Sequence, residues 1–115
     1  MYSRVFIAAL CMAGWALAAP VSAQTAGVDL ARSNNCLACH QVDQKRVGPA
    51  FAKIGERFAG QEGAIAYLAT AIREGSRSRW GAVPMPAQPQ VSPANAQLIA
   101  AWILSLGEQS QPSIK

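Results

Sequence analysis

The segment Cys36–His40, with the sequence CLACH, constrains this chain more than any other. Two cysteines three positions apart, with a histidine directly after the second, form the pattern through which a c-type haem is attached. Each thiol can form a thioether with one haem vinyl group, and the histidine then lies under the iron. Beyond residue 23 the chain has no other cysteine or histidine, and Met85 is its only methionine. If the iron takes two protein ligands of the usual kinds, they can only be His40 and Met85.

Other interpretations of the motif stay open from its residues alone. A thioredoxin-like redox pair needs a strand–helix setting, and the chain shows no alternating strand pattern. A structural zinc site normally takes four cysteine or histidine ligands, and only three occur beyond residue 23. A disulfide would close a very small loop and add little stability. Chance is the last alternative. It is disfavoured because the motif contains every cysteine and histidine beyond residue 23. We therefore predict one haem c per chain, bound covalently through Cys36 and Cys39.

Residues 1–23 predict a secretory signal peptide. Arg4 supplies a short positive region, Val5–Ala19 is fifteen uncharged and mostly apolar residues, and Val21–Ala23 offers small residues for cleavage. A membrane anchor is the alternative, but fifteen residues fall short of the roughly 20 needed to span a bilayer. A lipid anchor on the cysteine at position 11 is disfavoured because the preceding residue is a large leucine.

We expect cleavage after Ala23, a periplasmic protein, and one small domain over residues 24–115. Removing 23 of the 115 residues leaves 92, a length that buries only a modest core. A haem would supply much of the missing apolar interior. Loss of Arg4 lowers the formal net charge from +4 to +3, and two haem propionates would bring the protein close to neutral. Nucleic-acid binding, which depends on clustered lysine and arginine, is therefore disfavoured.

Apolar periodicity predicts an all-α domain with about four helices. The expected helices, after a loose start over 24–27, cover 28–35, 50–59, 61–74 and 92–106. In the first of them Asp29 would occupy the first turn and Leu30 the buried face. In the middle two the apolar residues at helical spacing are Phe51, Ile54 and Phe58, then Ile65, Leu68 and Ile72, with Gly75 as the C-terminal cap. In the last, Ser92 caps the start, Gly107 the end, and Leu98, Ile99, Trp102, Ile103 and Leu106 share one face.

Residues 76–91 lack periodicity and contain Pro84, Pro86 and Pro89, which predicts a long loop. Loops of this length inside a small domain are usually functional. Met85 lies between two of the prolines, which stiffen the backbone on both sides of it. A lone methionine is often an adaptable core filler, but this stiffness suits a thioether held against an iron. A sulfur ligand opposite an imidazole raises the reduction potential.

Several motifs agree in order and spacing with one known family. They are CLACH at 36–40, VGPA at 47–50, FAG at 58–60, WG at 80–81, PMP at 84–86 and WILSL at 102–106. Between Val28 and Leu106 the chain thus resembles a short bacterial class I cytochrome c, a small single-haem electron carrier of the periplasm. The resemblance implies the class I cytochrome c fold, in which the helices pack around one covalently attached haem and the first and last helices cross near their ends.

The resemblance also implies roles for two further residues. Pro49 would pack beside His40, and a backbone carbonyl of its region would accept a hydrogen bond from the far ring nitrogen. Trp80 would donate its indole N–H to a haem propionate. The alternatives are an ordinary turn at Gly48-Pro49 and a core or surface aromatic at Trp80.

Two departures from the family pattern concern the surroundings of the haem. Ala71 stands where relatives often carry a basic residue near a propionate. Arg73 or Arg79 could compensate for that charge, or the propionate could be left to water. The loop after Met85, residues 87–90, is one residue longer than in some relatives.

The predicted function is electron transport, not catalysis. His40 and Met85 would stay bound in both iron states, and the protein would shuttle single electrons, as a monomer without a stable membrane anchor, between a respiratory donor complex and a terminal oxidase or reductase. A haem enzyme or gas sensor would need the open iron position that Met85 fills, and a non-haem binding module would carry no covalent haem.

Two groups of basic residues complete the sequence pattern. They are Lys45, Arg46, Lys53 and Arg57, and then Arg73, Arg77 and Arg79. Each group is either an ordinary solvated surface or a means of steering the protein toward an acidic face of a redox partner.

Overall fold

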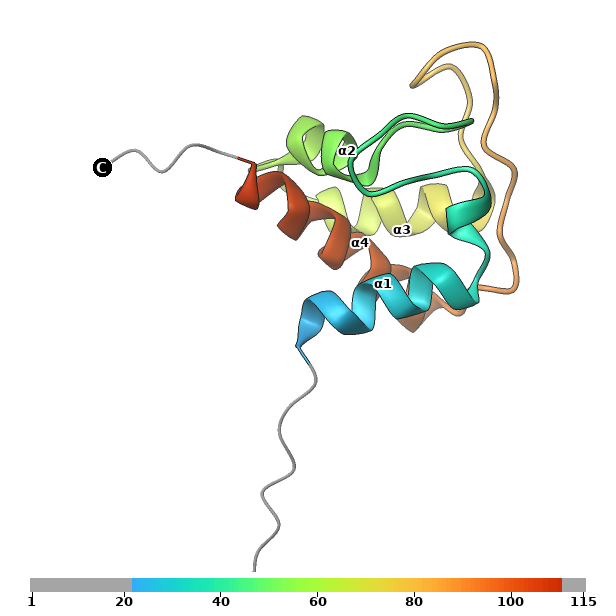
Figure 1. The fold of residues 1–115 in the computed structure, drawn as a ribbon. Coiled ribbons are helices and arrows are strands. Elements are labelled where there is room, and N and C mark those ends of the chain that lie inside the picture. Colours follow the sequence, from blue (N-terminus) through green and yellow to red (C-terminus); the bar gives the residue numbers. More distant parts are fainter. Residues whose placement is uncertain (1–21, 111–115) are drawn as a thin grey trace, which may run out of the picture.

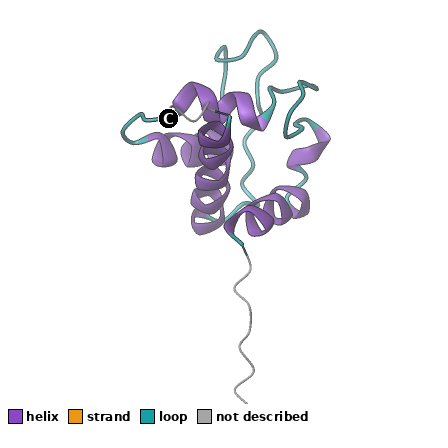
Figure 2. Ribbon diagram, turned by 60° about the vertical axis from the view of Figure 1, so that its left-hand side comes forward, coloured by secondary structure: helices purple, strands orange, loops and turns teal. Residues whose placement is uncertain are grey.

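Four α-helices and one short 3₁₀ helix make up the part of the chain that the computed structural model describes, residues 22–110 (Figures 1 and 2). The elements are α1 (Ala23–Ser33), η1 (Cys36–Ala38), α2 (Phe51–Phe58), α3 (Ala64–Glu74) and α4 (Pro93–Gln109). Strand pairing within residues 22–110 is limited to one isolated antiparallel bridge between Ser76 and Met85. The predicted all-α class with four helices is therefore confirmed, whereas the apolar segment Val5–Ala19 lies outside the described residues.

Helix α4 is the centre of the fold, since α1, α2 and α3 all pack on it. In Figure 1 it runs between α2 on one side and α1 on the other. Its start is as predicted, because the Ser92 hydroxyl accepts a hydrogen bond of 3.1 Å from the Asn95 amide and Pro93 opens the first turn. Ile99, Trp102 and Ile103 are buried against the other helices.

Two expectations for α4 were wrong. Leu98 is 57% exposed, because the neighbouring Ile99 faces the core and consecutive helix positions are about 100° apart. Gly107 does not end the helix, which continues to Gln109. A Cβ atom on Gly107 would run into the backbone of Gly55 and Glu56 in α2. Glycine is therefore present at this point because α2 and α4 cross with their backbones in contact.

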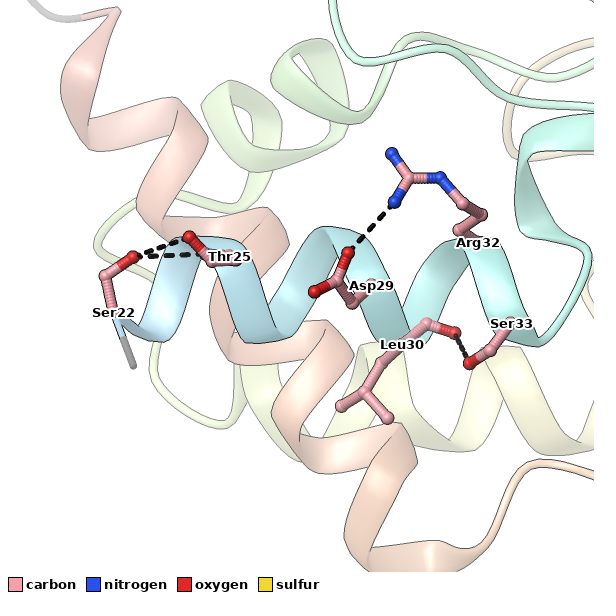
Figure 3. A network of polar contacts seen from close by, with 6 residues as sticks. All are labelled: Ser22, Thr25, Asp29, Leu30, Arg32 and Ser33. Atoms are coloured by element: carbon pink, nitrogen blue, oxygen red, sulfur yellow. Dashed lines mark hydrogen bonds and ion pairs between the residues drawn. The ribbon is translucent and has the colours of Figure 1, made fainter. Parts of the chain in front are cut away.

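Helix α1 starts earlier than predicted. Residues 24–27 are helical instead of loose, because the Ser22 hydroxyl accepts a hydrogen bond from the Thr25 amide and caps the first turn (Figure 3). Asp29 consequently lies beyond the first turn, where it pairs with Arg32 at 2.9 Å. The helix ends at Asn34, as expected, and Gly27 lies against the Trp102 side chain where α1 crosses α4.

Helix α2 matches its prediction within one residue at each end, whereas α3 begins three residues later than expected. Gly63, with φ of +74°, precedes it in the left-handed region, which interrupts a right-handed helix and favours glycine. Ile65, predicted to be buried, is 42% exposed, and the buried face is made by Ala64, Leu68, Ala69 and Ile72. Gly75 caps the C-terminus as predicted, with φ of +89° and its amide donating to the Ala71 carbonyl.

The two long loops of the domain lie on one side of the helices. These are the segment from η1 to the start of α2 and the segment from α3 to α4. Figure 1 shows them on the right as teal and orange loops. Residues of both segments line one cavity. The helices thus form a scaffold that presents two loops to each other. No helix among residues 22–110 is both long and apolar enough to cross a membrane.

We predict that Gly107→Ala destabilises the protein. Alanine favours a helix over glycine by about 1 kcal/mol, but here its methyl group meets backbone on the facing helix, and such overpacking costs about 1–3 kcal/mol. The free energy of unfolding, measured by denaturant titration followed by circular dichroism, should therefore fall. Glu108→Ala at the exposed neighbouring position is the control and should change it by less than about 0.5 kcal/mol. A Gly107→Ala protein as stable as the wild type would show that the crossing has room for a side chain.

Candidate functional site

One cavity between the two loops and the helices contains every site residue predicted from the sequence. These predicted residues come from the loop segments and are Cys36, Cys39, His40, Pro49, Trp80 and Met85. Its apolar wall comes from α2, α3 and α4 and includes Phe51, Ile54, Leu68, Ile72, Ile99 and Ile103. The cavity thus combines an apolar interior with the two thiols and the imidazole of the CLACH segment and with the thioether of Met85, which lies far from them in the sequence.

His40 is the one polar or charged residue of the described chain whose side chain is buried, with 7% exposed. Its Nδ1 lies 2.7 Å from the carbonyl oxygen of Pro49. Because a carbonyl oxygen can only accept, Nδ1 carries the proton and donates, which leaves Nε2 with a free lone pair. The Phe51 ring stacks on the imidazole at a centroid distance of 4.8 Å. The ring is therefore fixed in both orientation and tautomer, as a metal-binding histidine requires.

Gly48 makes room for the His40 ring. A Cβ atom at this position would lie 2.5 Å from Cε1 and 2.9 Å from Nδ1 of the imidazole, far inside contact distance. The Gly48 amide also donates to the Cys39 carbonyl at 2.8 Å, which ties this turn back to the CLACH segment. The sequence predicts only a turn at Gly48, and nothing in the local pattern reveals that its α-carbon faces the imidazole.

The two thiols are presented by η1. Asn35, with φ of +62°, turns the chain out of α1 into this single 3₁₀ turn, and the His40 amide then donates to the Cys36 carbonyl at 3.0 Å. Both cysteines are free thiols, Cys36 partly buried and Cys39 exposed. Burial raises the pKa of the Cys36 thiol, and the neighbouring Cys39 adds to that rise, although a backbone hydrogen bond opposes it. The turn therefore brings both thiols and the imidazole to the same wall of the cavity.

Met85 is anchored at the end of α3 by its own backbone. Its amide donates to the Ser76 carbonyl at 2.8 Å, and its carbonyl accepts from the Ser76 amide at 3.0 Å. A Cβ atom on Gly75 would lie 2.8 Å from the Met85 carbonyl oxygen, so glycine is needed for this close approach. Further along the loop, the Gln88 amide donates to the Ile72 carbonyl at 3.0 Å. The methionine therefore occupies a fixed position in a segment that otherwise lacks regular structure.

Trp80 lies at the cavity in a cluster of aromatic and basic side chains. The Arg57 guanidinium is 4.5 Å from the Trp80 ring centroid, and it donates a 2.8 Å hydrogen bond to the Arg79 carbonyl. The Arg79 guanidinium in turn lies 4.6 Å from the Tyr67 ring centroid. Arg57 and Arg79 belong to different basic groups in the sequence, and only the packing of the 76–91 loop against α2 and α3 brings them together.

The described residues fit a haem better than a bare metal ion. No group of three or more histidine, cysteine, aspartate or glutamate residues within 22–110 could hold an ion. The cavity offers instead one imidazole and one thioether, two thiols for covalent attachment, and an apolar wall for the faces of a flat macrocycle. This donor set is what a covalently attached haem with two axial ligands requires.

Comparisons with known proteins agree with this donor set. The model of the Cytochrome c family matches residues 24–107. Cytochrome c-552 of Nitrosomonas europaea is 46% identical over 98 residues, covering 85% of this chain and 87% of that protein. Cytochrome c-551 of Stutzerimonas stutzeri is 42% identical over 103 residues, covering 90% and 97%. The crystal structure of wild-type N. europaea cytochrome c552 superposes with a TM-score of 0.68 at 49% identity, covering 69% of this chain and 98% of the other.

We predict that Gly48→Ala disturbs the His40 ring. The added methyl group would push the imidazole away from Pro49 and lengthen the 2.7 Å hydrogen bond. Solvent exchange of the Nδ1 proton, followed by NMR in the reduced protein, should therefore become faster by about tenfold or more, as loss of about 1.4 kcal/mol of protection implies. The control is Val47→Ala at the preceding residue, whose side chain is 54% exposed. Equal exchange rates in both variants would contradict the close contact between Gly48 and His40.

Proposed function

The chain belongs to the cytochrome c family, and on that premise we propose that it carries single electrons with His40 and Met85 as the axial ligands of its iron. The small cytochromes c to which it is similar are electron-transfer proteins, not enzymes. Its cofactor is one haem c, for which Cys36 and Cys39 occupy the attachment positions. When bound, the haem supplies an iron that alternates between the ferric and ferrous states.

The observation that carries the ligand assignment is that His40 and Met85 line the same cavity and are each fixed by main-chain contacts. His40 is held through its ring by the Pro49 carbonyl, and Met85 is held through its backbone by Ser76. Fixed ligands suit electron transfer, because a site that keeps its geometry in both oxidation states needs little rearrangement. A soft sulfur opposite an imidazole favours the ferrous state and gives a positive potential.

We propose that redox partners dock at the edge of the cavity. Val47 and Val83, which line it, are 54% and 66% exposed, respectively. Exposed apolar residues beside a redox centre suit brief contacts with a small buried area. The partners would be a respiratory donor complex and a terminal oxidase or reductase, and the protein would act as a monomer.

We further propose that residues 1–23 are a signal peptide and that the mature protein is periplasmic. Class I cytochromes c similar to this chain are typically periplasmic. The family match begins at residue 24, directly after the proposed cleavage position. Cleavage there would remove Ser22, whose hydroxyl caps α1, at a cost of about 1 kcal/mol in helix stability.

We predict that Met85→Ala opens a position on the iron. The reduced native protein should not bind carbon monoxide at neutral pH and, when oxidised, should show a weak sulfur-to-iron absorption band in the near infrared. Because Met85 is the only methionine beyond residue 23, the variant should lose this band and bind carbon monoxide, which a shift of the main haem absorption band would report.

The matched control for this experiment is Val83→Ala, which changes an exposed residue of the same loop. It should retain the near-infrared band and remain inert to carbon monoxide. If the native reduced protein itself binds carbon monoxide readily, Met85 is not a ligand and the carrier function is wrong.

We predict that the chain, expressed in a bacterium with the haem-attachment machinery, is recovered from the periplasm with Gln24 as its first residue. Intact mass spectrometry would report both the loss of residues 1–23 and the added mass of one haem. Ala23→Arg should block cleavage, because the residue before the cut must be small. Recovery of the wild-type chain from the membrane fraction, with residues 1–23 uncleaved, would contradict the signal-peptide assignment.

A further inference from the structure

The cavity is lined by cations but by no carboxylate. Lys45 and Arg79 are its charged lining residues apart from the titratable groups of the CLACH segment, and no aspartate or glutamate of the described chain reaches it. The ion pairs found within residues 22–110 are Asp29–Arg32 and Lys53–Glu56. Arg79 therefore has no carboxylate partner among the described residues, although it stands at a cavity whose cofactor bears two propionate groups.

Arg79 is also held in place more firmly than a surface arginine usually is. Its guanidinium lies 4.6 Å from the Tyr67 ring centroid, within the range of a cation–π contact. Its carbonyl accepts a 2.8 Å hydrogen bond from Arg57, whose guanidinium covers the Trp80 ring. Tyr67 thus positions the Arg79 guanidinium, and Arg57 positions the Arg79 backbone and the Trp80 ring. A pre-positioned guanidinium loses little side-chain freedom when it pairs with a carboxylate.

We propose that Arg79 is the counter-ion of a haem propionate in this protein. Ala71 lines the cavity without charge, so Arg79 supplies from the loop a charge that α3 lacks at that position. Trp80 lies beside it, and its indole N–H donates to no other residue within 22–110, which leaves it free for the same propionate. The inference rests on the haem of the proposed function occupying this cavity.

The other basic residues nearby fit this role less well. Arg73 uses its Nε to donate to the Val91 carbonyl at 3.1 Å and does not line the cavity. Arg77 lies in the same loop and is exposed, as Arg79 is, but it does not line the cavity. Lys45 lines the cavity, but no hydrogen bond, ion pair or aromatic contact holds its ammonium group within the described chain. Arg79 alone among them combines access to the cavity with a fixed position.

The test compares the reduction potentials of the haem-loaded wild type, Arg79→Gln and Arg77→Gln at neutral pH. Both variants remove one positive charge from the same loop. Without a counter-ion, the propionate charge stabilises ferric iron, so Arg79→Gln should lower the potential more than Arg77→Gln does. The Arg77→Gln shift should disappear in about 1 M salt, where the screening length is about 3 Å, whereas the Arg79→Gln shift should persist. Arg79→Lys, which keeps the charge, should recover most of the difference.

A second readout follows the propionate itself. Its NMR signals should titrate at higher pH in Arg79→Gln than in Arg77→Gln, because loss of a nearby cation disfavours the ionised form. Equal shifts of the potential in the two variants, or a larger shift in Lys45→Gln, would overturn the assignment. A pyridine haemochrome assay on each variant separates this result from failure of the proposed function, since a chain without covalent haem would contradict that function instead.

Discussion

The hydrogen bond between His40 and the Pro49 carbonyl is the interaction on which the rest of the site depends. It fixes which ring nitrogen is free, because the loop conformation brings the Pro49 carbonyl oxygen within 2.7 Å of Nδ1. That conformation is maintained by one main-chain hydrogen bond on each side of Pro49. The Gly48 amide donates to the Cys39 carbonyl, and the Phe51 amide donates to the Gln41 carbonyl. The first turn of α2 is thereby joined to the CLACH segment, and the Phe51 side chain stacks on the imidazole from the same turn.

The two loops hold side chains of different stiffness, and each is anchored on the helix that adjoins it. The loop that carries His40 must present a side chain whose ring is fixed, and it does so with a close-packed glycine and a buried imidazole. The loop that carries Met85 must hold a flexible side chain. The two flanking prolines have no backbone N–H, so the Met85 amide is the one donor of this tripeptide, and it donates to the Ser76 carbonyl at 2.8 Å. In both cases the adjoining helix provides the anchor, α2 for the first and α3 for the second. Helix α4 packs on both and keeps the two anchors at a fixed separation.

Several features governed by neighbouring residues could be predicted from the sequence, although the Ser22 cap of α1 and the Gly63 start of α3 were missed. Features governed by distant contacts could not be predicted. The Ser92-Pro93 start of α4 and the Gly75 cap are local patterns, and each has the predicted conformation. Gly107 looked like a helix end because glycine commonly ends helices, but its role is set by Gly55, which lies 52 positions earlier. Leu98 looked buried because one-dimensional periodicity cannot show which of two adjacent apolar residues faces the neighbouring helices.

The cationic residues at the cavity, Lys45 and Arg79, lie in the loops, whereas the helices supply its apolar wall. A haem brings two carboxylates to a wall that is otherwise apolar, so burying it without a cation would cost free energy. An arginine on α3 would meet this need from the scaffold, but Ala71 occupies that place. Arg79 on the loop is fixed instead by aromatic rings, one from α3 and, through Arg57 of α2, one from the loop itself. Arg79 is exposed, but its contact with the Tyr67 ring holds the guanidinium beside the cavity, where its charge acts on the iron. In the proposed site, the axial pair sets the sign of the potential, and this cluster adjusts its size.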